Sequence, residues 1–465
     1  MILIEYETKK RVEKKMDITP EKQHALNCDY CKFNLSFDMP TEIIKAVKEN
    51  NLVIFAGAGI STENKLCFKS SLYQNVKVEL EVDNEEELSF SKVMSLFCNQ
   101  INGRKRLIQK IKERFDYVES FPELYKRATR FHSALGTIHS IKEIITTNWD
   151  DYFEKECGAT PFVTGEDVAF WSDTKRKVLK IHGSIQNLGS LIMTEEDYNR
   201  CYTEMNMGNI GALLKTLLAT KVIVYVGYSF GDEDFNKIYD YLVKDMKGLH
   251  PHAFMVTLDK SANEKLAGKN ITAIVTDGTY FIQTLKERLI QEDHVIDDTK
   301  HLILETFLDS YIDIHEHVAE GFNPIEYPQV IYSLCYQDGL IHSLERIQAK
   351  KKNGEYSCKG CLFLLLKSYQ ELRRNKVRNK NYIDVAYIDG YIIPIYYLLE
   401  DRVSNFDALN PFYLYGYKYG IKDYDEFSNL IKAKKIYSQA AHKLAVKIAG
   451  KYITEGIVYH HVPFL

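Results

Sequence analysis

Short apolar runs alternate with longer amphipathic segments over the first two thirds of the chain. Residues 41–51 carry apolar side chains at helical spacing and lead directly into an apolar run at 52–56. Further short runs, rich in β-branched residues and separated by helix-length segments, follow at 143–147, 178–182, 222–227, 253–257 and 272–276. This alternation predicts an α/β fold built on a doubly wound parallel sheet.

Other parts of the chain have a helical pattern or no regular pattern. Residues 80–139 are mostly periodic in the helical sense and predict a helical insertion over the sheet. From about residue 295 long helical patterns replace the strands, at 341–350, 362–374 and 426–448. We therefore expect an N-terminal extension (1–39), a Rossmann-like α/β domain (40–294) and a C-terminal α-helical domain (295–465).

Composition and charge exclude several classes of protein. The hydrophobic fraction of 45% and the charged fraction of 27% are close to globular averages, which excludes disordered and coiled-coil chains. A net charge of −4 gives no overall field that favours nucleic acid or anionic lipid. No signal-peptide pattern and no run of about 18 apolar residues is present, so we expect a cytoplasmic protein without membrane contact.

The nine cysteines of a chain without an export signal are expected to be reduced thiols. Cys28/Cys31 and Cys358/Cys361 have the CxxC spacing of metal ligands. Each pair supplies only two of the four ligands that structural zinc requires, so a zinc site would need the two ends of the chain to meet. We expect no metal, with a composite site of the two pairs as the alternative.

Four loops with glycine or polar residues begin where predicted strands end. They cover residues 57–61, 146–150, 182–184 and 227–232. The carboxyl ends of parallel strands lie along one edge of a sheet, and ligands bind in the crevice outside that edge. We therefore expect the four loops to converge on one pocket.

Each loop has both a functional and a purely structural interpretation. Glycines such as Gly57 let a backbone approach a pyrophosphate, but they also join strands to helices. Asn148 and Asp150 are two residues apart and can face one ligand, or Asp150 can cap the next helix. His182 at a strand end and Asp232 in a turn have equally plain structural roles.

Taken together and in this order, the four loops resemble the sirtuin superfamily. The matching residues are Gly57-Ala58-Gly59-Ile60-Ser61, Asn148-x-Asp150, His182-Gly183 and Gly227-x-Ser229. The segments NNLVIFAGAGIS, TTNWDD and KIHGS are most similar to the divergent bacterial branch of anti-phage defence systems. The resemblance covers roughly residues 40–290.

The resemblance implies a role for each matching residue, with NAD+ as the substrate. Asn148 would orient water or polarise the glycosidic bond, Asp150 would hold the nicotinamide or its ribose, and His182 would act as a general base or bond the ribose. The implied NAD+-binding residues are Gly57, Ala58, Gly59, Ile60, Ser61, Thr147, Gly183, Gly227, Ser229 and Asp232.

Two departures from the family pattern indicate which activity to expect. Deacylating sirtuins carry a four-cysteine zinc module before the G-x-S loop, whereas residues 185–226 contain only Cys201. The usual acyl-lysine-binding stretch after the glycine loop is replaced by residues 62–69, TENKLCFK. The resemblance therefore implies that NAD+ is hydrolysed to nicotinamide and ADP-ribose, with water as the acceptor and no metal.

The resemblance to the anti-phage branch of the sirtuins implies that the protein is an effector that depletes NAD+ in abortive infection. Such effectors are held inactive until a homo-oligomer or a defence partner releases them: an ATPase, a short Argonaute, a nucleotide signal or a phage protein. The helical domain would then be regulatory. The alternatives are an NAD-dependent deacylase or ADP-ribosyltransferase, and a non-catalytic nucleotide-sensing subunit. The joint presence of Asn148, Asp150 and His182 argues against the last alternative.

The C-terminal third has two weaker features. A basic run includes Arg373, Arg374 and Lys376 and is either a solvated helix end or a site for phosphate, nucleic acid or an acidic protein. The many tyrosines, such as Tyr413 and Tyr415, suit either a partner surface or packing inside the helical domain.

Overall fold

A computed structural model describes residues 33–61, 68–82, 88–228, 249–400, 409–452 and 460–463, together with Tyr239 and Met246. The chain divides into two compact units. The α/β unit contains His24–Glu292 and Lys352–Gly354, and the helical unit contains Met1–Gln23, Asp293–Lys351 and Glu355–Leu465. Most of the expected N-terminal extension (1–32), including Cys28 and Cys31, lies outside the described residues.

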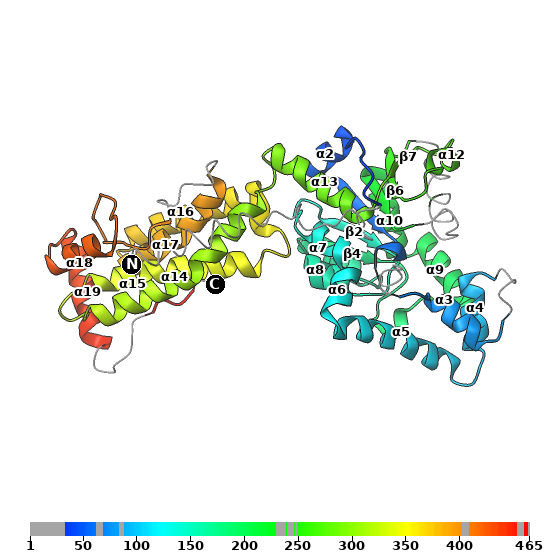
Figure 1. Cartoon of the computed structure of the whole chain (residues 1–465), viewed down its shortest axis with the longest axis horizontal. Helices are drawn as coiled ribbons and strands as arrows, with labels where there is room; N and C mark the ends of the chain where they lie inside the picture. The colour runs from blue at the N-terminus through cyan, green and yellow to red at the C-terminus, as the bar shows by residue number, and fades with distance from the viewer. Residues whose placement is uncertain are drawn as a thin grey trace. The chain divides into compact units, whose positions relative to one another are not determined.

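The α/β unit is built on a seven-stranded sheet in the order β3-β4-β2-β1-β5-β6-β7, in which every pairing is parallel. The chain runs from β1 to β2–β4 on one side and then to β5–β7 on the other. Figure 1 labels β2 and β4 on the first side and β6 and β7 on the second. The predicted doubly wound α/β fold is thus confirmed, with its switch point at β1. The strands are β1 (Leu52–Ala56), β2 (Glu143–Thr146), β3 (Thr160–Phe162), β4 (Lys177–Lys180), β5 (Val222–Val226), β6 (Ala253–Thr257) and β7 (Ile271–Val275).

The central strands are apolar along their whole length because helices cover both faces of the sheet. Every residue of β1, β5 and β6 is buried. A strand buried on both faces has no reason to alternate polar and apolar residues, which is why short continuous apolar runs identified these strands. Strand β3 was not predicted. It is a three-residue edge strand containing Pro161, with too few apolar residues to stand out.

The predicted helical insertion is present between β1 and β2 and contains α3 to α7. It begins at Leu72, earlier than the periodicity suggested. The helices of this unit are α2 (Thr41–Lys48), α3 (Leu72–Glu79), α4 (Phe90–Cys98), α5 (Gly103–Ser120), α6 (Pro122–Ala128), α7 (Arg130–Gly136), α8 (Tyr152–Cys157), α9 (Glu195–Met207), α10 (Asn209–Thr220), α12 (Ala262–Lys265) and α13 (Gly278–Gln291), with 3-10 turns η3 (Ala58–Ile60), η4 (Asp167–Asp173) and η5 (Leu188–Ser190).

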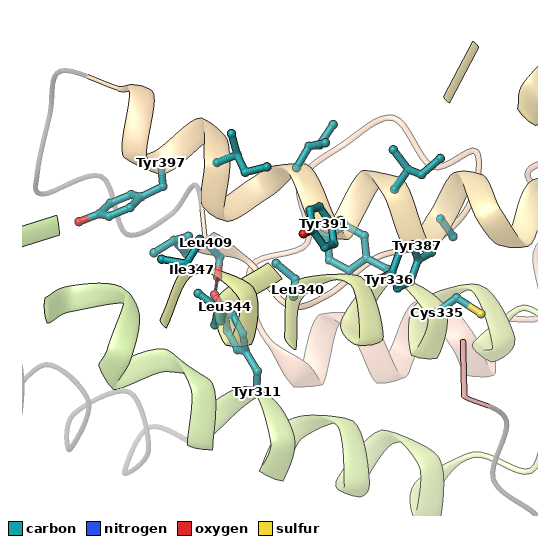
Figure 2. Packing of buried hydrophobic residues seen from close by; sticks show 14 of the residues in the cluster. Tyr311, Cys335, Tyr336, Leu340, Leu344, Ile347, Tyr387, Tyr391, Tyr397 and Leu409 are labelled. Carbon is teal, nitrogen blue, oxygen red and sulfur yellow. Dashed lines mark hydrogen bonds between the residues drawn. The ribbon is translucent and has the colours of Figure 1, made fainter. Parts of the chain in front are cut away.

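The helical unit packs long helices around an aromatic core. Its helices are α14 (Asp298–Gly321), α15 (Val330–Ala349), α16 (Lys359–Arg378), α17 (Tyr382–Leu399), α18 (Tyr424–Lys432) and α19 (Gln439–Tyr452), with the 3-10 turn η6 (Glu355–Ser357). Figure 2 shows buried tyrosines, including Tyr336 and Tyr387, among the leucines between these helices. The rings of Tyr336 and Tyr413 stack with centroids 4.6 Å apart. Many of the tyrosines therefore pack inside the unit.

The backbones of α15 and α17 approach each other most closely at two glycines. A Cβ atom on Gly339 would lie 2.1 Å from the carbonyl oxygen of Tyr387, and one on Gly390 would lie 1.9 Å from that of Tyr336. Neither position can therefore carry a side chain without moving the helices apart.

The prediction of one continuous helix over residues 426–448 is wrong, because the structure divides this range into α18 and α19. Lys434 adopts a left-handed conformation with φ of 51°, which ends the first helix. Ser438 then accepts a hydrogen bond from the backbone N–H of Ala441, 3.4 Å away, at the start of the second. Periodicity continued across the break because both helices bury an apolar face.

Two further sequence features are explained by the helical unit. In the basic run, Arg373 pairs with Asp389, and Lys376 lies 2.6 Å from a carboxylate oxygen of Asp384, which favours the solvated helix end. The expectation of reduced thiols is wrong for Cys358 and Cys361, which the structure joins as a disulfide.

None of the helices in the described ranges combines the length and apolar composition needed to cross a membrane.

A buried histidine in the α/β unit predicts acid sensitivity. His132 is fully buried, with its ring centroid 4.5 Å from that of Phe153, and this burial lowers its pKa to about 4. The ordinary pKa is about 6.5, so the unfolded chain binds more protons between these values and stability falls as pH drops from about 6.5 to 4. The loss should reach about 3 kcal/mol. Urea unfolding at pH 7 and pH 5 should show a smaller difference for His132→Phe than for the wild type.

The exposed His317 provides the control for this prediction. His317→Phe should keep the wild-type pH dependence. An unchanged difference between pH 7 and pH 5 in His132→Phe would show that other groups cause the acid sensitivity.

Candidate active site

The loops that follow β1, β2, β4 and β5 border one cavity at the carboxyl edge of the sheet. The cavity volume is about 280 Å³. Of the predicted site residues, it brings together Ala58, Ser61, Thr147, Asn148, Asp150 and His182. The other lining residues are Ser71, Leu72, Tyr73, Phe90, Ile111, Arg114, Phe115, Trp149, Tyr198 and Tyr228.

Within the described residues, the glycines of the first and fourth loops pack against each other. The N–H of Gly57 donates to the carbonyl of Val226 (2.8 Å), and the N–H of Gly59 donates to that of Gly227 (3.0 Å). A Cβ atom on Gly57 would lie 2.7 Å from the oxygen of Gly227. The glycines thus let two loops approach closely, and that contact fixes the loop beside the cavity.

Ser61 follows the short turn η3, and its hydroxyl accepts a hydrogen bond from Nδ2 of Asn148 at 3.4 Å. Ser71 caps α3 and forms a capping box with Gln74. Residues 62–67 lie outside the described part of the chain.

Asn148 is held in one orientation by its neighbours. Its backbone N–H donates to Oγ1 of Thr146 (3.0 Å), and its side-chain Nδ2 donates to the carbonyl of Gly57 (3.1 Å). The residue is buried, and Oδ1 accepts no hydrogen bond from the described residues. The amide therefore lines the cavity with an oxygen that a ligand or water can use.

Asp150 is buried, and a buried lysine, Lys180, forms a hydrogen bond with its backbone. Its Oδ1 accepts a hydrogen bond from the N–H of Tyr152 at 3.3 Å, so part of the helix-capping interpretation holds. Its backbone carbonyl accepts from the buried Nζ of Lys180. That ammonium group also pairs with Glu154 at 3.3 Å, while burial raises the pKa of Glu154. The network fixes the backbone on which Asp150 is carried.

His182 follows β4 and lies at the wall of the cavity. It is 3% exposed, and its ring meets that of Tyr198 edge to face, with centroids 5.1 Å apart. Gly183 has φ of 84°, and a Cβ atom there would lie 2.2 Å from the carbonyl oxygen of Ser190. The glycine therefore allows the sharp turn that carries the imidazole into the cavity.

Some predicted residues do not line the cavity. Gly57, Gly59, Ile60, Gly183 and Gly227 shape the surrounding loops. Ser229 and Asp232 lie outside the described residues.

The sequence interpretation missed several lining residues. The Tyr228 hydroxyl lies 3.1 Å from Oγ1 of Thr147, and the rings of Trp149 and Phe90 have centroids 6.1 Å apart. Trp149 and Tyr228 adjoin predicted site residues, so adjacency could have identified them. Phe90 and Arg114 come from the insertion, and no local pattern connects them to the loops.

The fold places the chain's α/β unit in the class of Rossmann-like domains, and the family comparison specifies the class further. Residues 142–274 match the family model of the SIR2-like domain. The chain therefore carries a SIR2-like domain, and the recognition of a sirtuin-like fold is confirmed.

Curated relatives extend this resemblance beyond the matched residues. The chain is 25% identical over 327 residues to the NAD(+) hydrolase ThsA of Cytobacillus dafuensis, covering 66% of this chain and 63% of that protein. It is 24% identical over 277 residues to the defense-associated sirtuin 2 of Bacillus subtilis, covering 57% of this chain and 25% of that protein. The chain thus spans less than two thirds of the length of these relatives.

Gly227 should tolerate substitution less well than a glycine of similar conformation elsewhere. Gly227 has φ of 76°, and a Cβ atom would lie 2.8 Å from the oxygen of Gly57. Gly268 has φ of 84° with nothing within 4 Å of its Cβ position. Both alanine variants incur backbone strain of about 1–2 kcal/mol. Only Gly227→Ala forces two loops apart, which adds about 1–3 kcal/mol.

Chemical denaturation of the two variants measures this difference. Equal losses of unfolding free energy in Gly227→Ala and Gly268→Ala would show that the loop contact adds nothing to stability.

Proposed function

We propose that this chain is an NAD+ glycohydrolase that cleaves NAD+ to nicotinamide and ADP-ribose. The observation that carries the proposal is the convergence of Asn148, Asp150 and His182 on one cavity at the switch point of the sheet. The names of the curated relatives as NAD(+) hydrolases support the same activity.

The proposed chemistry needs positioning and electrostatics rather than a strong nucleophile. The C1′–N bond to the cationic nicotinamide ring breaks, so that nicotinamide leaves as a neutral molecule and positive charge develops on the ribose; water then attacks C1′ and gives up a proton. Oδ1 of Asn148, whose Nδ2 is committed to Gly57, is placed to accept a hydrogen bond from the attacking water. In this proposal Asp150 holds the nicotinamide or its ribose, and His182 bonds the ribose hydroxyls or takes the proton from water.

The rest of the cavity suits a dinucleotide. Trp149, Phe90 and Tyr198 offer aromatic surfaces for planar rings. Arg114 contributes a guanidinium group at the wall, held against the ring of Phe68 at 4.0 Å. A fixed cation of this kind suits a pyrophosphate. We therefore add Trp149, Phe90, Tyr198 and Arg114 to the residues that we propose to bind NAD+.

We further propose that the activity serves anti-phage defence by NAD+ depletion in the cytoplasm. The name of the defense-associated sirtuin supports this role. Uncontrolled loss of NAD+ would kill the host, so the helical domain, predicted at residues 295–465, would keep the enzyme inactive until a homo-oligomer, a ligand or a defence partner releases it.

The test is NAD+ consumption by the purified full chain, following nicotinamide and ADP-ribose. The assay is run at low and high protein concentration, and with and without cell extract from phage-infected bacteria. Equal release of both products would support the hydrolase. Consumption that occurs only with an acyl-lysine peptide would indicate a deacylase. Bound NAD+ without turnover in every condition would indicate a nucleotide-sensing subunit.

A further inference from the structure

Three potential metal ligands meet in the helical unit, and none of them lines the cavity of the α/β unit. Nε2 of His315 lies 3.2 Å from Nδ1 of His460, and Oδ1 of Asp338 lies 3.8 Å and 3.2 Å from those two nitrogens. His315 comes from α14, Asp338 from α15 and His460 from the segment 460–463. Among the described residues, this is the group whose ligand atoms converge on one point.

The spacing of the three atoms matches that of ligands around one ion. Two donors about 2.0–2.1 Å from a zinc ion at a tetrahedral angle lie about 3.3 Å apart. The observed separations of 3.2, 3.2 and 3.8 Å bracket this value. Two imidazoles and one carboxylate are also a common ligand set for divalent transition metals.

The surroundings of Asp338 support this interpretation. The carboxylate is 4% exposed, and its Oδ2 accepts a hydrogen bond from the backbone N–H of His461 at 2.6 Å. No lysine or arginine of the described ranges lies within 4.0 Å of it. A buried carboxylate usually has a cationic partner. Here Oδ1 of the carboxylate faces two imidazoles in the place where such a cation would lie.

A neighbouring network fixes the C-terminal segment in place. The ring of His461 stacks on Tyr387 with centroids 4.2 Å apart, and its Nε2 lies 3.1 Å from Oδ1 of Asp384. Asp338 is thus oriented through one oxygen while the other faces the histidines, as outer contacts orient ligands in metal sites. The side chain of His460 is 59% exposed, which leaves room for water to complete the coordination.

From this arrangement we propose that His315, Asp338 and His460 form a binding site for a divalent transition-metal ion of the zinc class. The ion joins the C-terminal segment to α14 and α15. The proposal departs from the expectation of no metal, which rested on cysteine spacing, and it is independent of the NAD+ hydrolase activity.

The experiment treats the full chain with a chelator, removes the chelator and titrates Zn²⁺ by calorimetry. We expect one ion at this site, a higher melting temperature with Zn²⁺, and at least a tenfold loss of affinity in His460→Ala. This variant is suited to the test because the side chain is largely exposed, so the chain should fold. His317→Ala, also on α14 and exposed, should bind Zn²⁺ like the wild type.

Co²⁺ distinguishes this site from binding to cysteine thiolates elsewhere in the chain. Imidazole and carboxylate ligands give visible d–d bands, whereas thiolate ligands add strong near-ultraviolet charge-transfer absorption. We expect the visible bands alone, and their loss in His460→Ala. Equal Zn²⁺ affinity in His460→Ala and the wild type, no binding at all, or a thiolate spectrum would each overturn the proposal and leave the group as a hydrogen-bonded chain of side chains.

Discussion

Asn148→Ala should hydrolyse NAD+ at least about 100-fold more slowly than the wild-type chain, by analogy with the loss of a fixed polar group at a reacting centre. The substitution removes Oδ1 from the cavity wall and the Nδ2 that bonds to the Gly57 carbonyl. The loss should appear mainly in kcat, because the aromatic and cationic walls that we propose to bind the dinucleotide remain. The measurement is initial-rate NAD+ hydrolysis under the condition in which the wild type turns over.

Asn209→Ala is the matched control. Its Nδ2 also donates to a backbone carbonyl, that of Gly165 at 3.3 Å, but on the surface. His182→Ala should lower the rate of NAD+ hydrolysis to a similar extent as Asn148→Ala if both residues act on the same step. A rate for Asn148→Ala within threefold of the wild type would remove this residue from the proposed mechanism and shift attention to His182 and Asp150.

Gly390→Ala should destabilise the helical unit strongly. A methyl group at this position meets the carbonyl oxygen of Tyr336 on α15 at 1.9 Å, so α15 and α17 must separate. Such overpacking costs about 1–3 kcal/mol. Gly360 on α16 has nothing within 4 Å of its Cβ position, and alanine there should stabilise the helix by about 1 kcal/mol. The two variants should differ by about 1–3 kcal/mol, because both replace a helical glycine by alanine and only Gly390→Ala incurs the overpacking cost.

Thermal and urea unfolding of both variants measures this difference. The pair is informative because the substitution and its effect on the unfolded chain are the same, while Gly360 lies in the first turn of α16 and Gly390 inside α17. If Gly390→Ala were as stable as Gly360→Ala, α15 and α17 would not pack closely at this point.

The sheet could be predicted because its central strands are continuous apolar runs. The runs at 52–56 and 253–257 coincide with β1 and β6. Strand β3 escaped prediction since an edge strand gains its place from pairing with β4 and has little apolar content of its own. The break at Lys434 also escaped prediction, because a single left-handed residue leaves no trace in hydrophobic periodicity.

The convergence of Asn148, Asp150 and His182 could be predicted from topology alone. Parallel strands place their following loops along one edge, whatever the distance in sequence. Contacts between distant segments could not be predicted. The hydrogen bond from the N–H of Gly57 to Val226 of β5 and the position of Arg114 at the cavity depend on packing that no local pattern records.

The short segment Lys352–Gly354 determines when the α/β unit can be completed. Arg176, buried beneath the sheet edge, donates to the carbonyl of Asn353 at 3.3 Å, and the Cβ position of Gly354 lies against the backbone of Thr137. During synthesis, a ribosome that has made residue 292 has not yet supplied these partners. The nascent α/β unit must therefore wait for about 60 more residues before its last contacts form. A fragment cut at Glu292 would lack them permanently, so expression fragments of this chain should extend beyond Gly354.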